Sequence, residues 1–378
     1  MSTAPLGVYV HIPFCAKRCD YCAFVTTVGN DHLHQRYVAS LTAELELRRG
    51  AELRRRVTSV FFGGGTPSRL EPSLIAALIE RIDRAPGCEV TLEINPEDVS
   101  DERLAGYVDA GVTRMSVGMQ STAPHVLADL GREHRGGDAR QIARAIARSG
   151  VSTWSMDLIV GSVAETDEDL RRSVGDVLDH DDAPPHVSAY LLSVERGTPL
   201  SRDVSRHPDD DVLAHRYELL DALLVDRGYD WYEISNWARP GHECTHNRLY
   251  WDQGDYVGIG VGAHSHHQGR RAWNVGNLMT YLETIEAGTI PVLGSESLEP
   301  EAVAFEALSL KLRTSDGVPV TAISGGEDLD EFLERRGDHL VLTRAGRRMA
   351  DAVALRLVPP APARPEDAGE PGSFGAYE

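Results

Sequence analysis

Three closely spaced cysteines near the start of the chain restrict its fold and chemistry more than any other feature. Cys15, Cys19 and Cys22 follow the spacing C-x3-C-x2-C and are three of the five cysteines in 378 residues. Thiolates this close in sequence converge only if a loop wraps them around a metal centre. An iron–sulfur cubane normally takes four thiolates, so three protein ligands would leave one iron open to a cofactor or substrate.

Other interpretations of the cysteine loop have to be weighed. His11 and the three cysteines have the composition of a Cys3His zinc site. However, His11 falls inside a predicted strand over residues 7–12, four residues before Cys15, and is poorly placed to join the loop. Three buried thiols without a metal do not suit a loop that also carries Lys17, Arg18 and Asp20.

Composition and charge exclude several classes of protein. The formal net charge is −20, from 38 basic and 58 acidic residues, which disfavours binding to nucleic acid or to an anionic membrane. The N-terminus lacks a basic region followed by an apolar one, and no apolar run is long enough to span a bilayer. An odd number of cysteines, three of them clustered, favours a reducing compartment. We therefore expect a cytoplasmic protein with no transmembrane segment and no nucleic-acid partner.

Strands and helices alternate through the first half of the chain. Six short apolar runs predict strands, and helical patterns lie between them. The predicted strands cover residues 7–12, 59–62, 90–94, 114–117, 155–160 and 187–192, and the predicted helices 31–45, 72–84, 101–110, 138–149 and 167–178. Six units are too few to close an eight-unit barrel. The sequence therefore predicts an α/β fold with a partial, open (β/α)6 TIM-like barrel.

Polar and glycine-rich residues gather at the predicted strand ends, which form the working face of such barrels. The run 63–66 ends the second strand, Glu93 the third and Gln120 the fourth, while Asp157 lies in the fifth. Alone, each has an ordinary explanation. Three glycines often form only a turn, Glu93 and Asp157 suit any barrel mouth, and Arg132 could cap a surface helix. Their joint order along the chain favours a ligand site.

The cysteine loop resembles the signature of radical S-adenosylmethionine (SAM) proteins, in which an aromatic residue, here Tyr21, precedes the last cysteine. The longer string YVHIPFC, residues 9–15, resembles the branch of the oxygen-independent coproporphyrinogen oxidase and its relatives. This resemblance implies a radical SAM barrel in which Cys15, Cys19 and Cys22 bind a [4Fe-4S] cluster. It further implies that the amino and carboxylate groups of SAM chelate the open iron.

The resemblance extends to the strand ends. Residues 64–67, GGTP, resemble the motif that contacts the amino group of SAM in that superfamily. By the same resemblance the SAM contacts are Tyr9, Gly64, Gly65, Thr66, Glu93, Gln120, Arg132 and Asp157. Carboxylates suit ribose hydroxyls and an arginine fork suits a carboxylate. One departure is the run Gly161-Ser162-Val163, where relatives usually show a Gly-Leu-Pro-like turn.

A second motif, His246-Asn247-x-x-Tyr250-Trp251, follows the barrel. A histidine among aromatic residues and Arg248 suits a flat, anionic macrocycle, because imidazole can ligate iron, rings stack and guanidinium pairs with propionates. The alternative is that the aromatic residues pack a sheet edge and His246 bonds a backbone group.

This motif resembles the HNxxYW motif of the haem-chaperone, or HemW-type, branch, where it is associated with haem. The resemblance implies haem binding, with His246 as a ligand. His242 and Cys244 are nearby alternatives, or partners of His246 in a zinc site. The oxidase branch has a further cysteine where this chain has Phe24, and a longer N-terminal extension. We therefore expect a haem chaperone that delivers haem to respiratory haem proteins. The alternative is an oxidase-type radical SAM oxidative decarboxylase, so enzyme activity stays open.

We expect four regions along the chain. Residues 1–195 form the radical SAM partial barrel, and 196–294 a barrel extension with a helix over 211–227, an aromatic strand over 229–237 and the HNxxYW segment. Residues 295–358 form a small winged-helix-like domain, with helices over 302–312, 328–335 and 344–355 and a strand over 340–343. Residues 359–378 carry five prolines and form a disordered tail.

Overall fold

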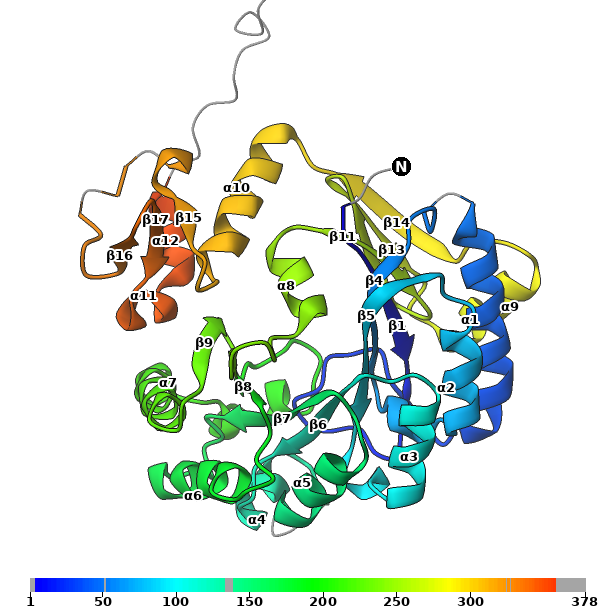
Figure 1. Cartoon of the computed structure of the whole chain (residues 1–378), viewed down its shortest axis with the longest axis horizontal. Coiled ribbons are helices and arrows are strands. Elements are labelled where there is room, and N and C mark those ends of the chain that lie inside the picture. Colours follow the sequence, from blue (N-terminus) through cyan, green and yellow to red (C-terminus); the bar gives the residue numbers. More distant parts are fainter. Residues whose placement is uncertain (1–3, 51, 133–138, 324, 327, 358–378) are drawn as a thin grey trace, which may run out of the picture. The chain divides into compact units, whose positions relative to one another are not determined.

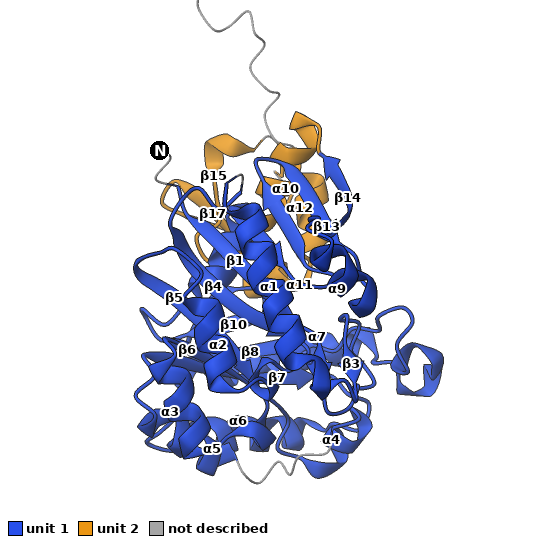
Figure 2. Cartoon of the chain, turned by 90° about the vertical axis from the view of Figure 1, so that its right-hand side faces the viewer, with its two compact units in different colours: residues 1–297 blue, residues 298–378 orange. Residues whose placement is uncertain are grey.

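The computed structural model describes residues 4–357, except 51, 133–138, 324 and 327. The chain forms two compact units, residues 1–297 and 298–378 (Figure 2). The predicted tail over 359–378 lies outside the described residues. The finer boundary at residue 195 stays a prediction. Within the described residues, no helix has both the length and the apolar composition needed to cross a bilayer.

The first unit is built on one twelve-stranded sheet in the order β14-β13-β12-β11-β1-β4-β5-β6-β7-β8-β10-β9. Six of its strands follow one another in chain order and pair in parallel, which confirms the predicted run of βα units: β1 (Leu6–Ile12), β4 (Val57–Gly64), β5 (Arg84–Ile94), β6 (Arg114–Gln120), β7 (Thr153–Val160) and β8 (His186–Leu191). The sheet order has two free ends in the described chain, so the barrel is open.

Most helices of this unit cover the outer, convex side of the sheet (Figure 1). They are α1 (His34–Arg49), α2 (Pro72–Ile79), α3 (Asp101–Asp109), α4 (Pro124–Asp129), α5 (Ala139–Arg148), α6 (Asp167–Leu178), α7 (Asp210–Val225) and α9 (Leu278–Glu286). One helix, α8 (Thr245–Trp251), lies on the inner, concave side (Figure 1). Short 3-10 turns complete the unit: η1 (Asp31–Leu33), η2 (Pro67–Arg69), η3 (Pro96–Asp98), η5 (Leu200–Arg202) and η6 (Val204–Arg206).

Side chains of the parallel strands alternate between two different environments, as the two-residue period of a strand requires. On β1, Val8 and Val10 point outward and are fully buried under the helices. Tyr9 and His11 point inward. The register aligns inward residues of neighbouring strands, pairing Tyr9 with Phe61. The outer face is therefore an apolar core, and the inner face carries polar chemistry.

Strands beyond the six parallel ones extend the sheet at both edges. On one side β11 (Asp255–Ile259) adds a seventh parallel strand next to β1, followed by antiparallel β12 (His264–His267), β13 (Arg270–Asn274) and β14 (Val292–Ser297). On the other side β10 (Asn236–Ala238) pairs with β8 and β9 (Asp230–Glu233). The single strand predicted over 229–237 is therefore wrong, because the chain turns back at residues 234–235. A small two-stranded sheet joins β2 (Phe14–Cys15) to β3 (Thr27–Val28).

Two further predicted boundaries need correction. The helix predicted over 72–84 ends at Ile79, and Arg84 already pairs with Val57 as the start of β5. The HNxxYW segment is helical rather than a sheet edge. In both cases pairing or packing with distant residues decides the local structure, which a single stretch of sequence does not reveal.

In its described residues, the second unit contains a three-stranded antiparallel sheet with three helices. Its elements are α10 (Pro300–Leu312), β15 (Val318–Pro319), η7 (Val320–Ala322), β16 (Leu333–Arg336), β17 (His339–Leu342), α11 (Arg344–Arg348) and α12 (Ala350–Arg356). The helix predicted over 328–335 is wrong, because Leu333–Arg336 forms a hairpin with β17. The helix predicted over 344–355 is interrupted at Met349. The winged-helix likeness stays a prediction.

Candidate functional site

The three loop cysteines and most of the predicted strand-end residues line one cavity of about 780 Å³. Cys15, Cys19 and Cys22 are free thiols and half-buried. The cavity is also lined by Gly64, Gly65, Thr66, Glu93, Gln120, Arg132 and Asp157. Tyr9 and His246 are absent from its wall. The structure thus brings together all but two of the predicted site residues.

The donor set of the loop fits a metal cluster. Burial raises the pKa of the Cys15 thiol to about 11, so this sulfur needs a nearby cation to stay ionised. Thr66 Oγ1 lies 3.7 Å from Cys15 Sγ and Arg132 Nη1 lies 3.6 Å from Cys19 Sγ. Both can donate to sulfur, as donors around iron–sulfur clusters do. In the described part of the chain, no three potential ligands are already drawn together as a closed metal site.

His11 anchors the far end of the cysteine loop and is not available as a zinc ligand. Its Nε2 donates to the carbonyl of Val25 at 2.7 Å, so Nδ1 accepts from the hydroxyl of Tyr9 at 3.0 Å. Both ring nitrogens are thereby used. This geometry disfavours the Cys3His zinc site. It also shows that Tyr9 supports the cysteine loop indirectly, through its hydrogen bond to His11.

The glycine run at the end of β4 is required by close contacts with the start of the cysteine loop. Gly64 has φ +115°, and a Cβ there would overlap the ring of His11. A Cβ on Gly65 would lie 2.7 Å from the carbonyl carbon of Pro13. The amide of Gly65 donates to Ile12 at 2.8 Å and that of Thr66 to Phe14 at 2.8 Å. The run therefore holds the strand end against the start of the cysteine loop.

Glu93 presents a carboxylate to the cavity with an unusual proton affinity. Its Oε2 accepts from the amide of Gly64 at 3.1 Å. Burial, and then the charge of Asp157, raise the pKa of Glu93 to about 7. The other oxygen has no hydrogen-bond partner among the described residues, so it can accept from a ligand hydroxyl.

Arg132 points into the site and does not cap a surface helix. Its Nη2 donates to Asn95 Oδ1 at 3.0 Å and to the carbonyl of Gly118 at 2.9 Å. Asn95 in turn donates from Nδ2 to Thr66 Oγ1 at 3.1 Å. Gln120, at the end of β6 with φ +63°, completes this corner. The corner places a guanidinium where a ligand carboxylate could pair with it.

Asp157 is held by serines from three neighbouring strands. Its oxygens accept from Ser116 at 2.7 Å and from Ser155 at 3.0 Å. A further bond from Ser188 helps to keep the carboxylate ionised, although burial has the larger effect and raises its pKa. Asp157 therefore has a fixed orientation on the cavity wall.

The cysteine loop is clamped from outside by a distant segment. Arg206 donates from Nη1 to Asp20 at 2.9 Å and from Nε to Asp129 at 3.0 Å. The backbone of Asp20 also accepts from Leu200 at 2.9 Å. These bonds fix the loop to α4 and to the η5–η6 segment.

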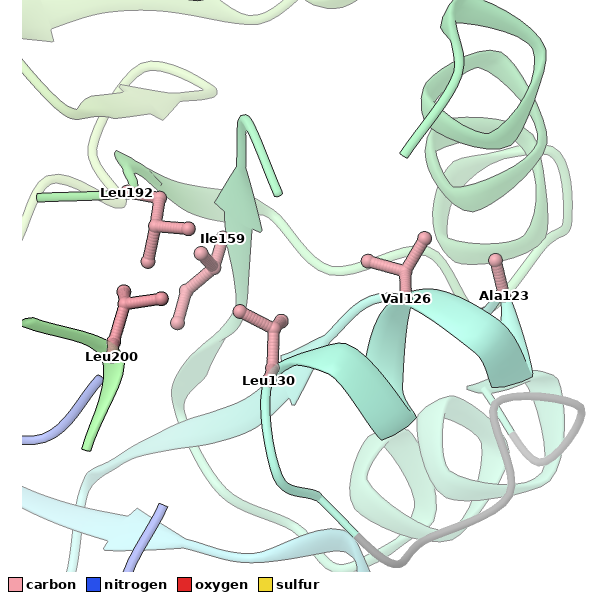
Figure 3. Close-up of a cluster of buried hydrophobic side chains, with 6 residues drawn as sticks. All are labelled: Ala123, Val126, Leu130, Ile159, Leu192 and Leu200. Atoms are coloured by element: carbon pink, nitrogen blue, oxygen red, sulfur yellow. The ribbon is translucent and has the colours of Figure 1, made fainter. Parts of the chain in front are cut away.

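A cluster of buried apolar side chains packs against the cysteine loop (Figure 3). It joins α4, β7, the end of β8 and η5, and Tyr21 of the cysteine loop packs against it. Its members are Ala123, Val126, Leu130, Ile159, Leu192 and Leu200. The cluster gives the loop an apolar support next to its polar clamp.

His246 lies in the interior and away from the cavity. It is fully buried, its Nδ1 hydrogen-bonds with Ser59 Oγ at 2.9 Å, and its Nε2 with the Tyr250 hydroxyl at 2.9 Å. Burial lowers the pKa of His246 to about 3, so the ring is neutral. Haem ligation by His246 stays a prediction, and it would require the hydrogen bond of the ligating nitrogen, to Ser59 or to Tyr250, to break. The bond to a backbone group that we weighed as an alternative is not the one observed.

The neighbouring candidates are also engaged. His242 Nδ1 hydrogen-bonds with Thr153 Oγ1 at 2.8 Å. Cys244 is fully buried, and Glu89 accepts from its thiol at 3.5 Å. Glu89 also accepts from the amide of His246 at 3.1 Å, at the start of α8. These side chains hold α8 against β5 and β7. Of the motif residues, Asn247 is the one that lines the cavity.

Comparison with known proteins agrees with this geometry. Residues 9–177 match the model of the Radical SAM superfamily. A protein named heme chaperone HemW from Mycobacterium tuberculosis (strain ATCC 25618 / H37Rv) is 43% identical over 376 residues, covering 95% of this chain and 96% of that protein. This chain belongs to the HemW family. The HemW of Escherichia coli (strain K12) is 37% identical over 266 residues, covering 69% of this chain and 70% of its own length.

A solved structure supports the fold of this HemW-family chain. The coproporphyrinogen III oxidase HemN from Escherichia coli matches with a TM-score of 0.78, covering 93% of this chain and 89% of that chain. At 20% identity the likeness shows the fold alone. Together with the match to the Radical SAM superfamily, this likeness confirms the predicted radical SAM fold.

Sequence reasoning missed several residues of this site. Asn95 is not among the predicted site residues, although it links Thr66 to Arg132. No sequence pattern marked Arg206 as a site residue, because its partners Asp20 and Asp129 lie 186 and 77 residues away in the chain. Tyr190 and Leu191 line the cavity from β8, and their place at a strand end was the available signal.

Proposed function

We propose that this protein is a haem chaperone that binds haem together with a [4Fe-4S] cluster and SAM. One observation carries the proposal. The free thiols of Cys15, Cys19 and Cys22 share a cavity with Glu93 and Arg132, in a chain of the HemW family.

Each group of residues in the cavity has its own proposed role in binding. Cys15, Cys19 and Cys22 would hold the cluster, and the cluster would supply a metal site for SAM. Gly64 and Gly65 allow the end of β4 to pack against His11 and Pro13, which places the strand end in the cavity wall beside the cysteine loop. Arg132 pairs with the carboxylate of SAM and Glu93 accepts from its ribose. The serine-held carboxylate of Asp157 forms a fixed wall of the same pocket.

The proposal also covers the proteins that receive haem and the compartment in which the transfer takes place. We infer that haem passes to respiratory haem proteins, and that this takes place in the cytoplasm. Clustered free thiols support a reducing compartment. The net charge of −20 argues against a nucleic-acid partner.

Oxidative decarboxylation of coproporphyrinogen is the second candidate, supported by the likeness in fold to HemN. Phe24 argues against it, because the oxidase branch resembled by the loop has a cysteine at that place. An anaerobic assay with coproporphyrinogen, SAM and a reductant decides between them. Formation of protoporphyrinogen at an enzyme-like rate would replace the chaperone proposal.

The chaperone proposal is tested by anaerobic reconstitution with iron and sulfide, followed by haem titration. We expect a broad iron–sulfur absorption band, lost in the Cys15/Cys19/Cys22→Ser variant, and a saturable haem band. Haem should then move to an added apo-haem protein. A wild-type protein that binds no haem contradicts the proposal.

A further inference from the structure

The HNxxYW helix is closed to a haem molecule in this structure. His246 is fully buried and both its ring nitrogens have partners, Ser59 and Tyr250. A Cβ on Gly7 would lie 3.0 Å from His246 Cε1, so β1 packs directly against the ring. No space for a macrocycle exists beside this imidazole unless α8 leaves the concave side of the sheet.

The mouth of the cavity, unlike the buried surroundings of His246, exposes large side chains to solvent. Phe24 on the cysteine loop is 65% exposed, and Tyr190 and Leu191 at the end of β8 are 45% and 36% exposed. All three line the same cavity. Exposed apolar side chains gathered at one opening are typical of a ligand site, because leaving them in water costs free energy. Aromatic rings at an opening also suit a flat ligand, which they can stack on.

Charge at this cavity differs from charge over the rest of the chain. The chain has 38 basic and 58 acidic residues, yet as many basic as acidic side chains line the cavity. Lys17 and Arg18 are exposed on the cysteine loop, close in sequence to Phe24. The cavity wall contains no histidine among the described residues. A dicarboxylic ligand would therefore find cations here without a histidine ligand.

We propose that the porphyrin ring of haem binds at the mouth of this cavity, against Phe24, Tyr190 and Leu191, and not at His246. The propionates meet the cations of the cysteine loop. This inference rests on the proposed haem-binding function and names its site. The HNxxYW helix then has a positioning role, in which His246 fixes α8 so that Asn247 reaches the cavity.

Titration with three ligands distinguishes the contributions of ring contacts, iron ligation and propionate charge to the binding affinity. We would titrate the reconstituted full chain with haem, metal-free protoporphyrin IX and the dimethyl ester of protoporphyrin IX. A site built on ring contacts binds haem and protoporphyrin within a few-fold of each other. The dimethyl ester lacks the carboxylates and should bind more weakly, by about tenfold, if the cations contribute.

A matched pair of variants locates the site. Leu191→Asp puts a charge at the mouth and should weaken protoporphyrin binding about tenfold or more. Leu293→Asp makes the same change on β14, where Leu293 is 67% exposed and outside the cavity wall. It should leave the affinity unchanged, and this control also measures non-specific adsorption. Leu191→Ser serves if the charged variant fails to fold, with iron content and circular dichroism as checks.

His246→Gln supplies the opposing test. We expect it to keep protoporphyrin affinity while losing thermal stability. The inference is overturned if a folded His246→Gln protein loses haem while both Leu191 variants bind normally. It is also overturned if haem binds far more tightly than the metal-free ring and only through His246. If wild type binds neither ligand, the proposed function itself fails, which is a different result.

Discussion

Arg206 Nη1 donates a hydrogen bond at 2.9 Å to the carboxylate of Asp20, inside the cysteine loop and 186 residues away in sequence. The same guanidinium holds Asp129 through Nε at 3.0 Å and through a second bond to its carbonyl oxygen. The path of the loop between Cys19 and Cys22 is therefore fixed in part by a residue that follows β8, the sixth parallel strand.

Replacing Arg206 should loosen the cysteine loop. A hydrogen bond to a charged group contributes about 1.5–3 kcal/mol, and Arg206→Met removes several at once. We expect less iron and sulfide per chain after reconstitution, with a faster loss of the cluster band in chelator. Arg202→Met, an exposed arginine on the neighbouring turn, is the matched control. Equal iron retention by the two variants would contradict a role for the clamp.

A methyl group on Gly64 should disrupt the site. Gly64→Ala places a Cβ into the His11 ring at φ +115°, so it combines a strained backbone with an overlap. We expect a loss of about 3 kcal/mol or more in unfolding free energy and poor cluster incorporation. Gly29→Ala has φ +77° and open space around the new Cβ, so it should cost only about 1–2 kcal/mol. Denaturant titration of both variants isolates the effect of the overlap.

SAM binding should depend on pH through Glu93. Burial and the charge of Asp157 raise the pKa of Glu93 to about 7, so the carboxylate gains a proton as the pH falls through 7. A protonated carboxyl accepts fewer hydrogen bonds from ribose hydroxyls. We expect the affinity for SAM to fall up to about tenfold between pH 8 and pH 6. Glu93→Gln should bind weakly with no step near pH 7, and an unchanged step in that variant would reject the assignment.

The buried imidazole of His246 should make the fold sensitive to acid. Burial lowers its pKa to about 3, whereas an unfolded histidine titrates near 6.5. Below pH 6.5 the imidazole of His246 binds a proton in the unfolded chain but stays neutral in the folded chain. The stability from neutral His246 is therefore complete above pH 6.5 and is lost as the pH falls toward 3. Between pH 7 and pH 5 the loss is about 2 kcal/mol.

The measurement is denaturant unfolding of wild type and His246→Gln at both pH values. The glutamine variant should be less stable at pH 7, because packing and hydrogen bonds change. Its decrease in stability between pH 7 and pH 5 should be smaller by about 2 kcal/mol. Parallel decreases in the two proteins would mean that another group carries the acid sensitivity.

Local patterns in the sequence predicted the cavity well. The spacing of the cysteines, the glycine run and the strand ends each depend on neighbouring residues, and six parallel strands bring those ends to one edge. For this reason Glu93 and Asp157 line the same cavity as Cys15 and Cys19. Arg132 also lines this cavity, but it follows α4 and was predicted from the family resemblance.

Features that depend on distant contacts were not predictable. The helical state of residues 245–251 and the burial of His246 follow from packing against Ser59 and Gly7. The hairpin over 333–342 replaces a predicted helix because β16 pairs with β17. The Arg206 clamp has no local signature at all, since arginines in loops usually face water.

The place of α8 on the concave side of the sheet also bears on the order of events at the site. A helix held there by His246, Ser59 and Glu89 occupies the lower part of the barrel. Both proposed ligands would therefore bind in the cavity at the strand ends. If haem covers the mouth of this cavity as proposed, SAM would have to bind against Glu93 and Asp157 before haem does. SAM would then be released only after haem has left, so binding and release would follow a fixed order.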